Sequence, residues 1–148
     1  NNLPVVIFIG DGFYKDKIIE LASRYKNIYY CKPVSPFELL NYSSSADFGL
    51  CLYENINLNH FYALPNKIFE YMMAEIPIIA SNLYEISQFI EKNGLGIIIE
   101  PNTFNLIQAV FKIINFEESE FKEKIKKAKC VFNWENQEKI FTQIYKEL

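Results

Sequence analysis

Short apolar runs alternate with helical stripes along the first two thirds of the chain. Runs rich in β-branched and aromatic residues predict five strands, at 4–10, 27–32, 47–53, 76–81 and 96–100. Apolar residues three and four positions apart predict the intervening helices, at 15–25, 35–44, 65–74 and 85–93, with a loop from residue 54 to 64. This alternation predicts an α/β fold, with a Rossmann-like parallel sheet and helices on both faces.

The last third of the chain is predicted to be entirely helical. One apolar stripe runs from Thr103 to Ile114. The next segment, 117–129, has acids first and lysines last, the order that complements a helix dipole. A final helix is expected over Trp134–Tyr145. Because no linker, repeat or low-complexity tract interrupts the chain, we expect a single domain over residues 1–148.

Two helix ends carry clear local signals. Ser35 is the expected N-cap of the second helix, with Pro36 at its first position and Glu38 three residues on, which is the capping-box pattern. Gly94 is expected to end the helix at 85–93.

Composition narrows the class of protein. The chain has 148 residues, of which half are hydrophobic, enough for a sizeable core. A net charge of −3 argues against a nucleic-acid partner. The 13 Phe and 10 Tyr fit either an aromatic core or an exposed patch that meets another domain. The chain does not begin with Met, which favours a fragment of a longer protein.

The cysteines do not form a metal site in this reading. Cys31, Cys51 and Cys130 are far apart, and His60 is the only histidine. We therefore expect free thiols in a reducing compartment and no structural zinc. No apolar run reaches the roughly 18 residues of a membrane span.

The start of the helix at 65–74 is the main candidate for a binding site. Ligands of parallel sheets bind beyond the carboxyl ends of the strands, and this helix follows the third strand. Pro65 needs no amide partner there, and the free amides of the first turn favour an anion. Lys67 adds positive charge, while Asn66 and Glu70 share a helix face. A diphosphate at the helix start and a ribose on Glu70 would fit. The alternative is an ordinary helix start with a solvated lysine.

The stretch "ALPNKIFEYMMAEIPIIAS" (63–81) resembles the donor-binding signature of retaining glycosyltransferases of family 4, which have the two-Rossmann-domain GT-B architecture. In a bacterial surface-polysaccharide subgroup this signature often reads like "LPNKxFEYMAxGxPVxAS". The resemblance extends over nearly the whole chain, from "VIFIGDG" through "YCKPVSPFELLNYSSSADFGLCLY" to "NGLGIIIEPN". It implies that this chain is the C-terminal half of a GT-B fold.

The resemblance implies roles for the residues near the third strand. Glu70 would bind the ribose hydroxyls of the donor. The backbone around Pro65, Asn66 and Lys67 would bind the diphosphate.

It also implies roles for two loops nearer the N-terminus. Lys32, Pro33 and Val34 would lie against the base, and Gly10 and Gly12 would let the first turn pass close to the ligand. Catalytic residues are not assigned.

The chain departs from the family pattern at three places. Tyr62 occupies the position of a second Glu thought to touch the donor sugar, so sugar recognition would need other groups of the 54–64 loop. Glu75 replaces the usual Gly after the signature helix, so we expect no left-handed cap there and a different turn. The family's Arg and Lys pair would lie upstream of Asn1.

Four polar residues of the 54–64 loop are available for sugar recognition, and none can be singled out: Glu54, Asn57, Asn59 and His60.

As implied by the resemblance, the full protein would be a bacterial hexosyl-type glycosyltransferase of polysaccharide or glycoconjugate biosynthesis. It would move a sugar from a nucleotide diphosphate to a hydroxyl acceptor, with retention and without a metal or other cofactor. It would need its N-terminal Rossmann domain, so the isolated chain is expected to be inactive. It would be cytoplasmic, with peripheral contact to the inner face of the membrane through that domain.

Two alternatives belong to other classes of protein. One is a non-catalytic nucleotide-binding module. The other is a dinucleotide-dependent oxidoreductase domain, which is disfavoured because "GDG" (10–12) lacks the Gly-x-Gly-x-x-Gly fingerprint.

Overall fold

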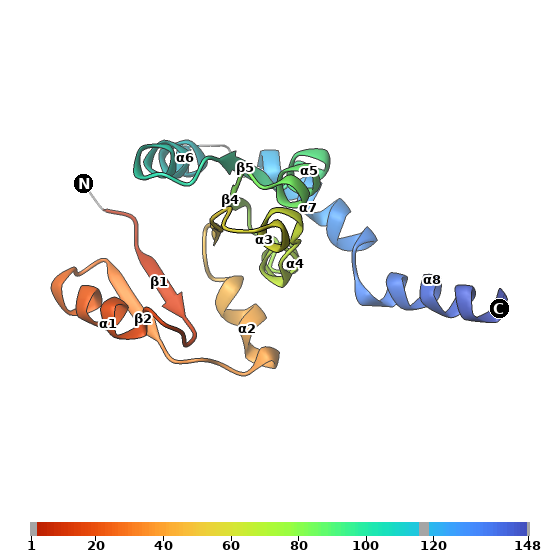
Figure 1. Ribbon diagram of the computed structural model, residues 1–148, viewed down its shortest axis with the longest axis horizontal. Coiled ribbons are helices and arrows are strands. Elements are labelled where there is room, and N and C mark those ends of the chain that lie inside the picture. Colours follow the sequence, from red (N-terminus) through yellow and green to blue (C-terminus); the bar gives the residue numbers. More distant parts are fainter. Residues whose placement is uncertain (1–2, 116–118, 148) are drawn as a thin grey trace. The chain divides into compact units, whose positions relative to one another are not determined.

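The computed structural model describes residues 3–115 and 119–147. The chain divides into two compact units, residues 1–39 and 40–148. We call them the N-terminal unit and the C-terminal unit, and each is described by itself (Figure 1). The single domain expected over the whole chain stays a prediction.

The N-terminal unit is a β-α-β element. Strands β1 (Val6–Ile9) and β2 (Ile28–Cys31) pair in parallel, and α1 (Lys15–Arg24) connects them. All three lie inside the predicted ranges. Helix α2 (Pro36–Ser43) crosses the boundary between the two units.

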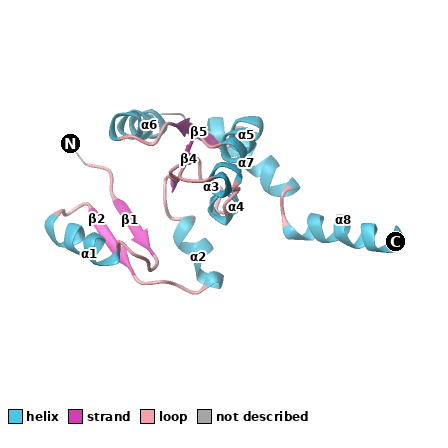
Figure 2. Ribbon diagram, viewed as in Figure 1, coloured by secondary structure: helices cyan, strands magenta, loops and turns pink. Residues whose placement is uncertain are grey.

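The C-terminal unit is built on a three-stranded parallel sheet. Its strands are β3 (Gly49–Cys51), β4 (Ile78–Ser81) and β5 (Gly96–Ile99), in the order β3-β4-β5. They lie between helices in the chain, which Figure 2 shows by colour. The helices of this unit after α2 are α3 (Leu58–Tyr62), α4 (Asn66–Met73), α5 (Tyr84–Asn93), α6 (Thr103–Asn115), α7 (Ser119–Val131) and α8 (Trp134–Glu147).

Two hydrophobic clusters show that helices cover both faces of this sheet. Neighbouring residues of a strand point to opposite faces. Ile78 and Ala80 of β4 belong to the larger cluster, which also takes buried residues from α4, α5 and α7. Ile79, between them in sequence, belongs to the other cluster, with Ala109 and Ile113 of α6. Parallel strands with helices on both faces confirm the predicted α/β class.

One predicted loop is partly helical. Residues 58–62 form α3, inside the segment expected to be a loop from 54 to 64. Asn57 caps this helix, because its side-chain Oδ1 accepts a hydrogen bond of 2.8 Å from the amide of His60. The predicted helix at 117–129 is confirmed from Ser119 onward, and its first two residues lie outside the described part of the chain.

Ser35 precedes α2, but the capping box is not formed as expected. The amide of Phe37 donates to the Ser35 hydroxyl at 3.4 Å, and the amide of Glu38 donates to the Ser35 carbonyl oxygen at 2.9 Å. The box would instead join the Glu38 amide to the Ser35 hydroxyl. Gly94 ends α5 in the left-handed conformation with φ 63°, as predicted.

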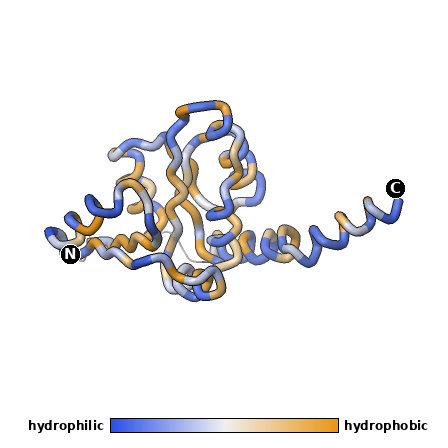
Figure 3. Tube along the Cα trace, turned by 60° about the horizontal axis from the view of Figure 1, so that its bottom comes forward, coloured by the Kyte–Doolittle hydropathy of each residue, from blue (hydrophilic) through white to orange (hydrophobic). Residues whose placement is uncertain are grey.

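Aromatic residues lie both in the core and on the surface, and that the exposed ones meet another domain stays a prediction. Several pack against the larger core cluster: Tyr53, Phe61, Phe69, Tyr71, Phe89, Phe121 and Phe132. Others are exposed, and α8 carries exposed Ile140, Phe141, Ile144 and Tyr145. Apolar and polar positions alternate along this helix in Figure 3. Within residues 3–115 and 119–147, no helix is long and apolar enough to cross a membrane.

The turn after α4 corrects one prediction. Glu75 itself adopts the left-handed conformation, with φ 61°, where a changed turn was expected. The amide of Glu75 donates to the carbonyl of Met72, and that of Ile76 to Tyr71, which together form a Schellman motif. The Glu75 carboxylate accepts a 2.7 Å hydrogen bond from Lys129 Nζ of α7, and this bond lowers the pKa of Glu75. The turn is therefore kept without glycine.

We expect Glu75→Gly to be more stable than Glu75→Ala by about 1 kcal/mol. Both variants lose the contact with Lys129, and only glycine adopts a positive φ without steric cost. Urea unfolding of the two variants, followed by circular dichroism, measures the difference. Equal free energies of unfolding would show that this turn carries no strain.

Candidate functional site

The carboxyl ends of the three parallel strands are tied together by polar contacts. The amide of Tyr53, just after β3, donates a 2.7 Å hydrogen bond to the hydroxyl of Ser81 at the end of β4. Ser81 is the one buried polar residue among the buried positions that the structure describes. The amide of Asn82 donates to the carbonyl of Ile99, and its side chain donates to Glu100 Oε1 at 2.8 Å. These hydrogen bonds hold together the carboxyl ends of β3, β4 and β5, from which the following loops and helices start.

The segment after β3 is ordered by its own side chains. The rings of Tyr53 and His60 meet edge to face with centroids 5.9 Å apart. His60 Nδ1 lies 3.0 Å from the carbonyl oxygen of Glu54, and Asn57 is used as the cap of α3. Two of the four polar residues considered for sugar recognition, Asn57 and His60, therefore have structural contacts.

Helix α4 starts without a side-chain cap. Pro65 is its N-cap in an extended conformation, and among the residues that the structure describes the helix has no side-chain cap hydrogen bond. The amide of Ile68 donates to the carbonyl of Pro65 at 3.1 Å, whereas Asn66 and Lys67 are exposed on the first turn. Uncapped amides at a helix N-terminus attract negative charge. Lys67 adds a full positive charge at the same end.

Glu70 lies one turn further along α4, half-buried. Burial raises the pKa of the Tyr53 phenol, and the charges of Cys51 and Glu70 raise it further. Burial likewise raises the pKa of Tyr71, followed by the charges of Cys51 and Glu70. The Glu70 charge therefore acts on both phenols.

The charge of Lys67 acts on Cys51, the last residue of β3. Burial raises the pKa of the Cys51 thiol to about 11, and the nearby Lys67 partly opposes this shift. Asn66 and Glu70 are four residues apart on α4 and so share a helix face, as the spacing predicted. Two residues that sequence reasoning did not single out, Tyr53 and Ser81, complete this edge. Ser81 had a visible signal, a small polar residue at the end of an apolar strand.

The remaining predicted site residues belong to the N-terminal unit. Gly10 has φ 137°, a conformation that favours glycine, and its amide donates to the carbonyl of Cys31 at 3.2 Å. A Cβ at Gly10 or Gly12 would meet no atom within 4 Å. Both glycines therefore border open space, in agreement with a turn that a ligand could approach.

The loop after β2 is accessible in this unit. Lys32 and Pro33 are exposed, and Val34 is half-buried. Nothing in the structure tests whether these residues, or any other predicted site residue, touch a ligand, so their roles stay predictions.

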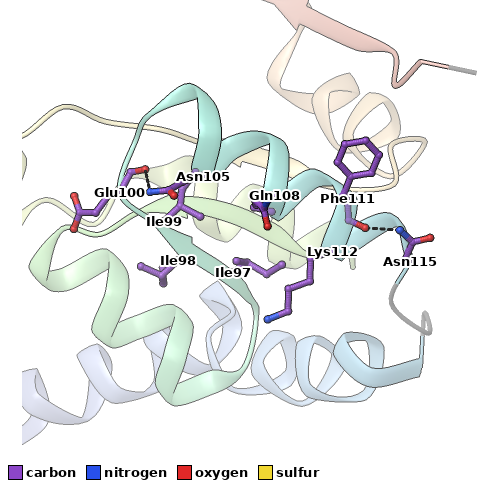
Figure 4. A pocket seen from close by; sticks show the side chains of 10 residues that line it. Ile97, Ile98, Ile99, Glu100, Asn105, Gln108, Phe111, Lys112 and Asn115 are labelled. Atoms are coloured by element: carbon purple, nitrogen blue, oxygen red, sulfur yellow. Dashed lines mark hydrogen bonds between the residues drawn. The ribbon is translucent and has the colours of Figure 1, made fainter.

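One cavity lies elsewhere, between β5 and α6. It has a volume of about 770 Å³ and is lined by Ile97, Ile98, Ile99, Glu100, Asn105, Gln108, Ala109, Phe111, Lys112 and Asn115 (Figure 4). The amide side chains of Asn105 and Asn115 donate to the backbone carbonyls of Glu100 and Phe111. These polar groups are occupied by local structure. Helix α6 also covers the opposite face of the sheet from α4. We therefore place the candidate site at α4.

The comparison with solved structures supports the fold. The chain is similar to WaaG, described as a glycosyltransferase involved in lipopolysaccharide biosynthesis, with a TM-score of 0.59 and 12% sequence identity. The match covers 86% of this chain and 33% of that chain, so this chain spans about a third of the length of the solved relative. The fold is therefore that of a fragment of this glycosyltransferase, in agreement with the GT-B fragment expected. No curated protein matches the sequence.

A family model gives the more direct assignment. The model described as "Glucosyltransferase 3-like, C-terminal domain" matches residues 12–145. This range includes most of each unit, the signature stretch 63–81 and nearly all of the closing helix. Since it covers nearly the whole chain, the protein belongs to the family of glucosyltransferase 3-like C-terminal domains.

Proposed function

We propose that this chain is the donor-binding domain of a retaining glycosyltransferase of the GT-B type, and that it binds a nucleotide diphosphate sugar at the start of α4. The observation that supports this most is the uncapped first turn of α4 with Lys67, followed one turn later on the same helix by Glu70. Amides and a lysine suit a diphosphate, and a carboxylate suits the two hydroxyls of a ribose.

The wider role follows from this binding site together with the family. A second domain would present the acceptor hydroxyl and complete the reaction centre, so the isolated chain would bind donor without transferring it. Amides, the helix dipole and basic side chains would stabilise the charge on the leaving diphosphate. The full protein would serve polysaccharide or glycoconjugate biosynthesis, with contact to the inner face of the membrane through its other half.

Calorimetric titration tests the binding proposal. We expect a nucleoside diphosphate and its glucose conjugate to bind, and the matching nucleoside without phosphates to bind much more weakly. UDP, GDP, ADP and dTDP, each with its glucose conjugate, form a suitable panel. If the parent nucleoside binds as tightly as the diphosphate, the helix start does not hold phosphate. If no member of the panel binds, the proposal is wrong.

We expect this binding to be independent of divalent metal. The amides of α4 and Lys67 already offer positive charge to a diphosphate. Magnesium and manganese need several oxygen ligands at once. Asp11, in the turn after β1, already accepts a 3.1 Å hydrogen bond from Lys15 Nζ. Titration with a chelator and then with millimolar manganese measures the effect. A tenfold gain in affinity with metal, about 1.4 kcal/mol, would contradict the prediction.

A further inference from the structure

One side chain of α4 lies directly against the backbone of β3. Gly49, the first residue of β3, is buried, and the ring of Tyr71 occupies the space that a side chain would take there. A Cβ at Gly49 would collide with Cγ and Cδ2 of Tyr71 and lie 2.6 Å from Cε2. The Tyr71 hydroxyl donates a 3.3 Å hydrogen bond to the carbonyl oxygen of Leu50, the next residue of the strand. Tyr71 therefore joins α4 to the start of β3.

The helix runs back along the strand from this contact. Because α4 lies in the connection between the parallel strands β3 and β4, its direction is opposite to that of β3. Lys67 and Tyr71 are four residues apart, so they are neighbours on one face of α4. Tyr71 contacts the first residue of β3, whereas the charge of Lys67 acts on its last residue, Cys51.

The spacing along the helix matches the spacing along the strand. Four residues of an α-helix rise about 6 Å, and two residues of a strand rise about 6.6 Å. With the ring of Tyr71 against Gly49, the start of α4 therefore reaches the carboxyl end of β3. A displacement of α4 by one turn, about 5.4 Å, would take Lys67 and the uncapped amides away from that end.

The buried residues of α4 do not specify this position equally well. Ile68 and Met72 are fully buried and belong to the larger core cluster, so they hold α4 on the sheet. The hydrophobic contribution of their burial is not directional. A ring that fits where the strand has no side chain, with its hydroxyl bonded to the next residue, is compatible with one position only.

We propose that Tyr71 is a positioning residue of the candidate site. By packing against Gly49 it sets the position of α4 along β3, and so it holds Lys67 and the amides of the first turn at the carboxyl end of the sheet. This inference rests on the proposed function, because these are the groups expected to bind the diphosphate. Tyr71 acts through them and does not contact the ligand.

Calorimetry with the nucleoside diphosphate that binds in the panel tests this role. We expect Tyr71→Leu to lower the affinity about tenfold, which is about 1.4 kcal/mol, because α4 loses its fixed position on β3. The number of binding sites per chain should equal that of the parent, whereas a loss of folded protein would reduce it. Tyr71→Phe keeps the ring and loses only the 3.3 Å hydrogen bond, so it should retain most of the affinity.

Two further variants separate the position of α4 from overall stability. Gly49→Ala pushes on the same ring from the strand and should also weaken diphosphate binding, which keeps the test valid if Tyr71→Leu does not fold. Phe132→Leu removes a ring that packs against the same core cluster and meets Phe89 of α5. It should lower the stability and leave the affinity unchanged. Retained affinity in a folded Tyr71→Leu or Gly49→Ala, or an equal loss in Phe132→Leu, would overturn the inference.

Failure of the proposed function is distinguishable from failure of this inference. If Lys67→Ala binds the nucleoside diphosphate as tightly as the parent, the phosphate site at the helix start is wrong whatever Tyr71 does. If Lys67→Ala loses affinity and Tyr71→Leu does not, the inference alone is wrong. If no member of the panel binds the parent chain, the inference is overturned with the proposed function.

Discussion

Replacing Gly96 with alanine is expected to destabilise the C-terminal unit by about 3 kcal/mol or more, at the upper end of the cost of overpacking. Gly96 is the first residue of β5 and pairs with Ile78 of the central strand β4. A Cβ at Gly96 would collide with the carbonyl oxygen of Ile78 and lie 2.7 Å from its carbonyl carbon and its nitrogen. These are backbone atoms of a fully buried strand, so they cannot move aside without disturbing the sheet.

Other glycines of the chain provide graded controls. Gly12→Ala should have little effect, because nothing lies within 4 Å of the added Cβ. Gly49→Ala should fall between the two, since the added Cβ meets the ring of Tyr71, which has some freedom to shift. Urea unfolding monitored by circular dichroism gives the three free energies. If Gly96→Ala is as stable as Gly12→Ala, the close pairing of β4 and β5 is not as the structure shows.

Glu70→Ala is expected to weaken nucleotide binding by a hundredfold or more while leaving the fold intact. If Glu70 accepts hydrogen bonds from both ribose hydroxyls, the variant loses two bonds to a charged acceptor. Each of these contributes roughly 1.5–3 kcal/mol at most. The side chain is half-buried and lies outside both core clusters, so its removal should not open a cavity. Calorimetry with the nucleoside diphosphate identified in the panel measures the loss.

Two further variants make this result specific. Glu70→Gln keeps the shape and one acceptor oxygen, so its affinity should lie between those of Glu70→Ala and the parent. The 2′-deoxy form of the same nucleotide should bind the parent more weakly and should lose less when Glu70 is replaced. Equal affinity of parent and Glu70→Ala would exclude the ribose role.

Much of the fold could be predicted from the sequence because most elements carry their own signal. Each apolar run ended near a glycine or a polar residue, so all five strands were located, although the run at 47–53 gave a strand of only Gly49–Cys51. The short helix α3 was missed because five residues are too few for an apolar periodicity to show. Its signal was local, an Asn at position 57 placed to cap the following turn.

The candidate site was only partly visible in the sequence. The spacing of Asn66 and Glu70 gave their common helix face, because a helix fixes which residues are neighbours. The hydrogen bond from Tyr53 to Ser81, and the effect of the Glu70 charge on the pKa of Tyr53, depend on the pairing of strands distant in sequence. The contact of Tyr71 with Gly49 likewise depends on the packing of α4 against β3, which no local pattern specifies.

The left-handed Glu75 has a consequence for the way such domains are found and redesigned. A search pattern that demands glycine after this helix would pass over chains in which a charged residue adopts the same backbone angles. In this chain the helix is closed by two backbone hydrogen bonds, and Glu75 pairs with Lys129 on the opposing helix. Glu75 lacks the conformational freedom of glycine, but its carboxylate forms an ion pair with Lys129, which is distant in sequence. Glu75 and Lys129 should therefore be varied together rather than singly.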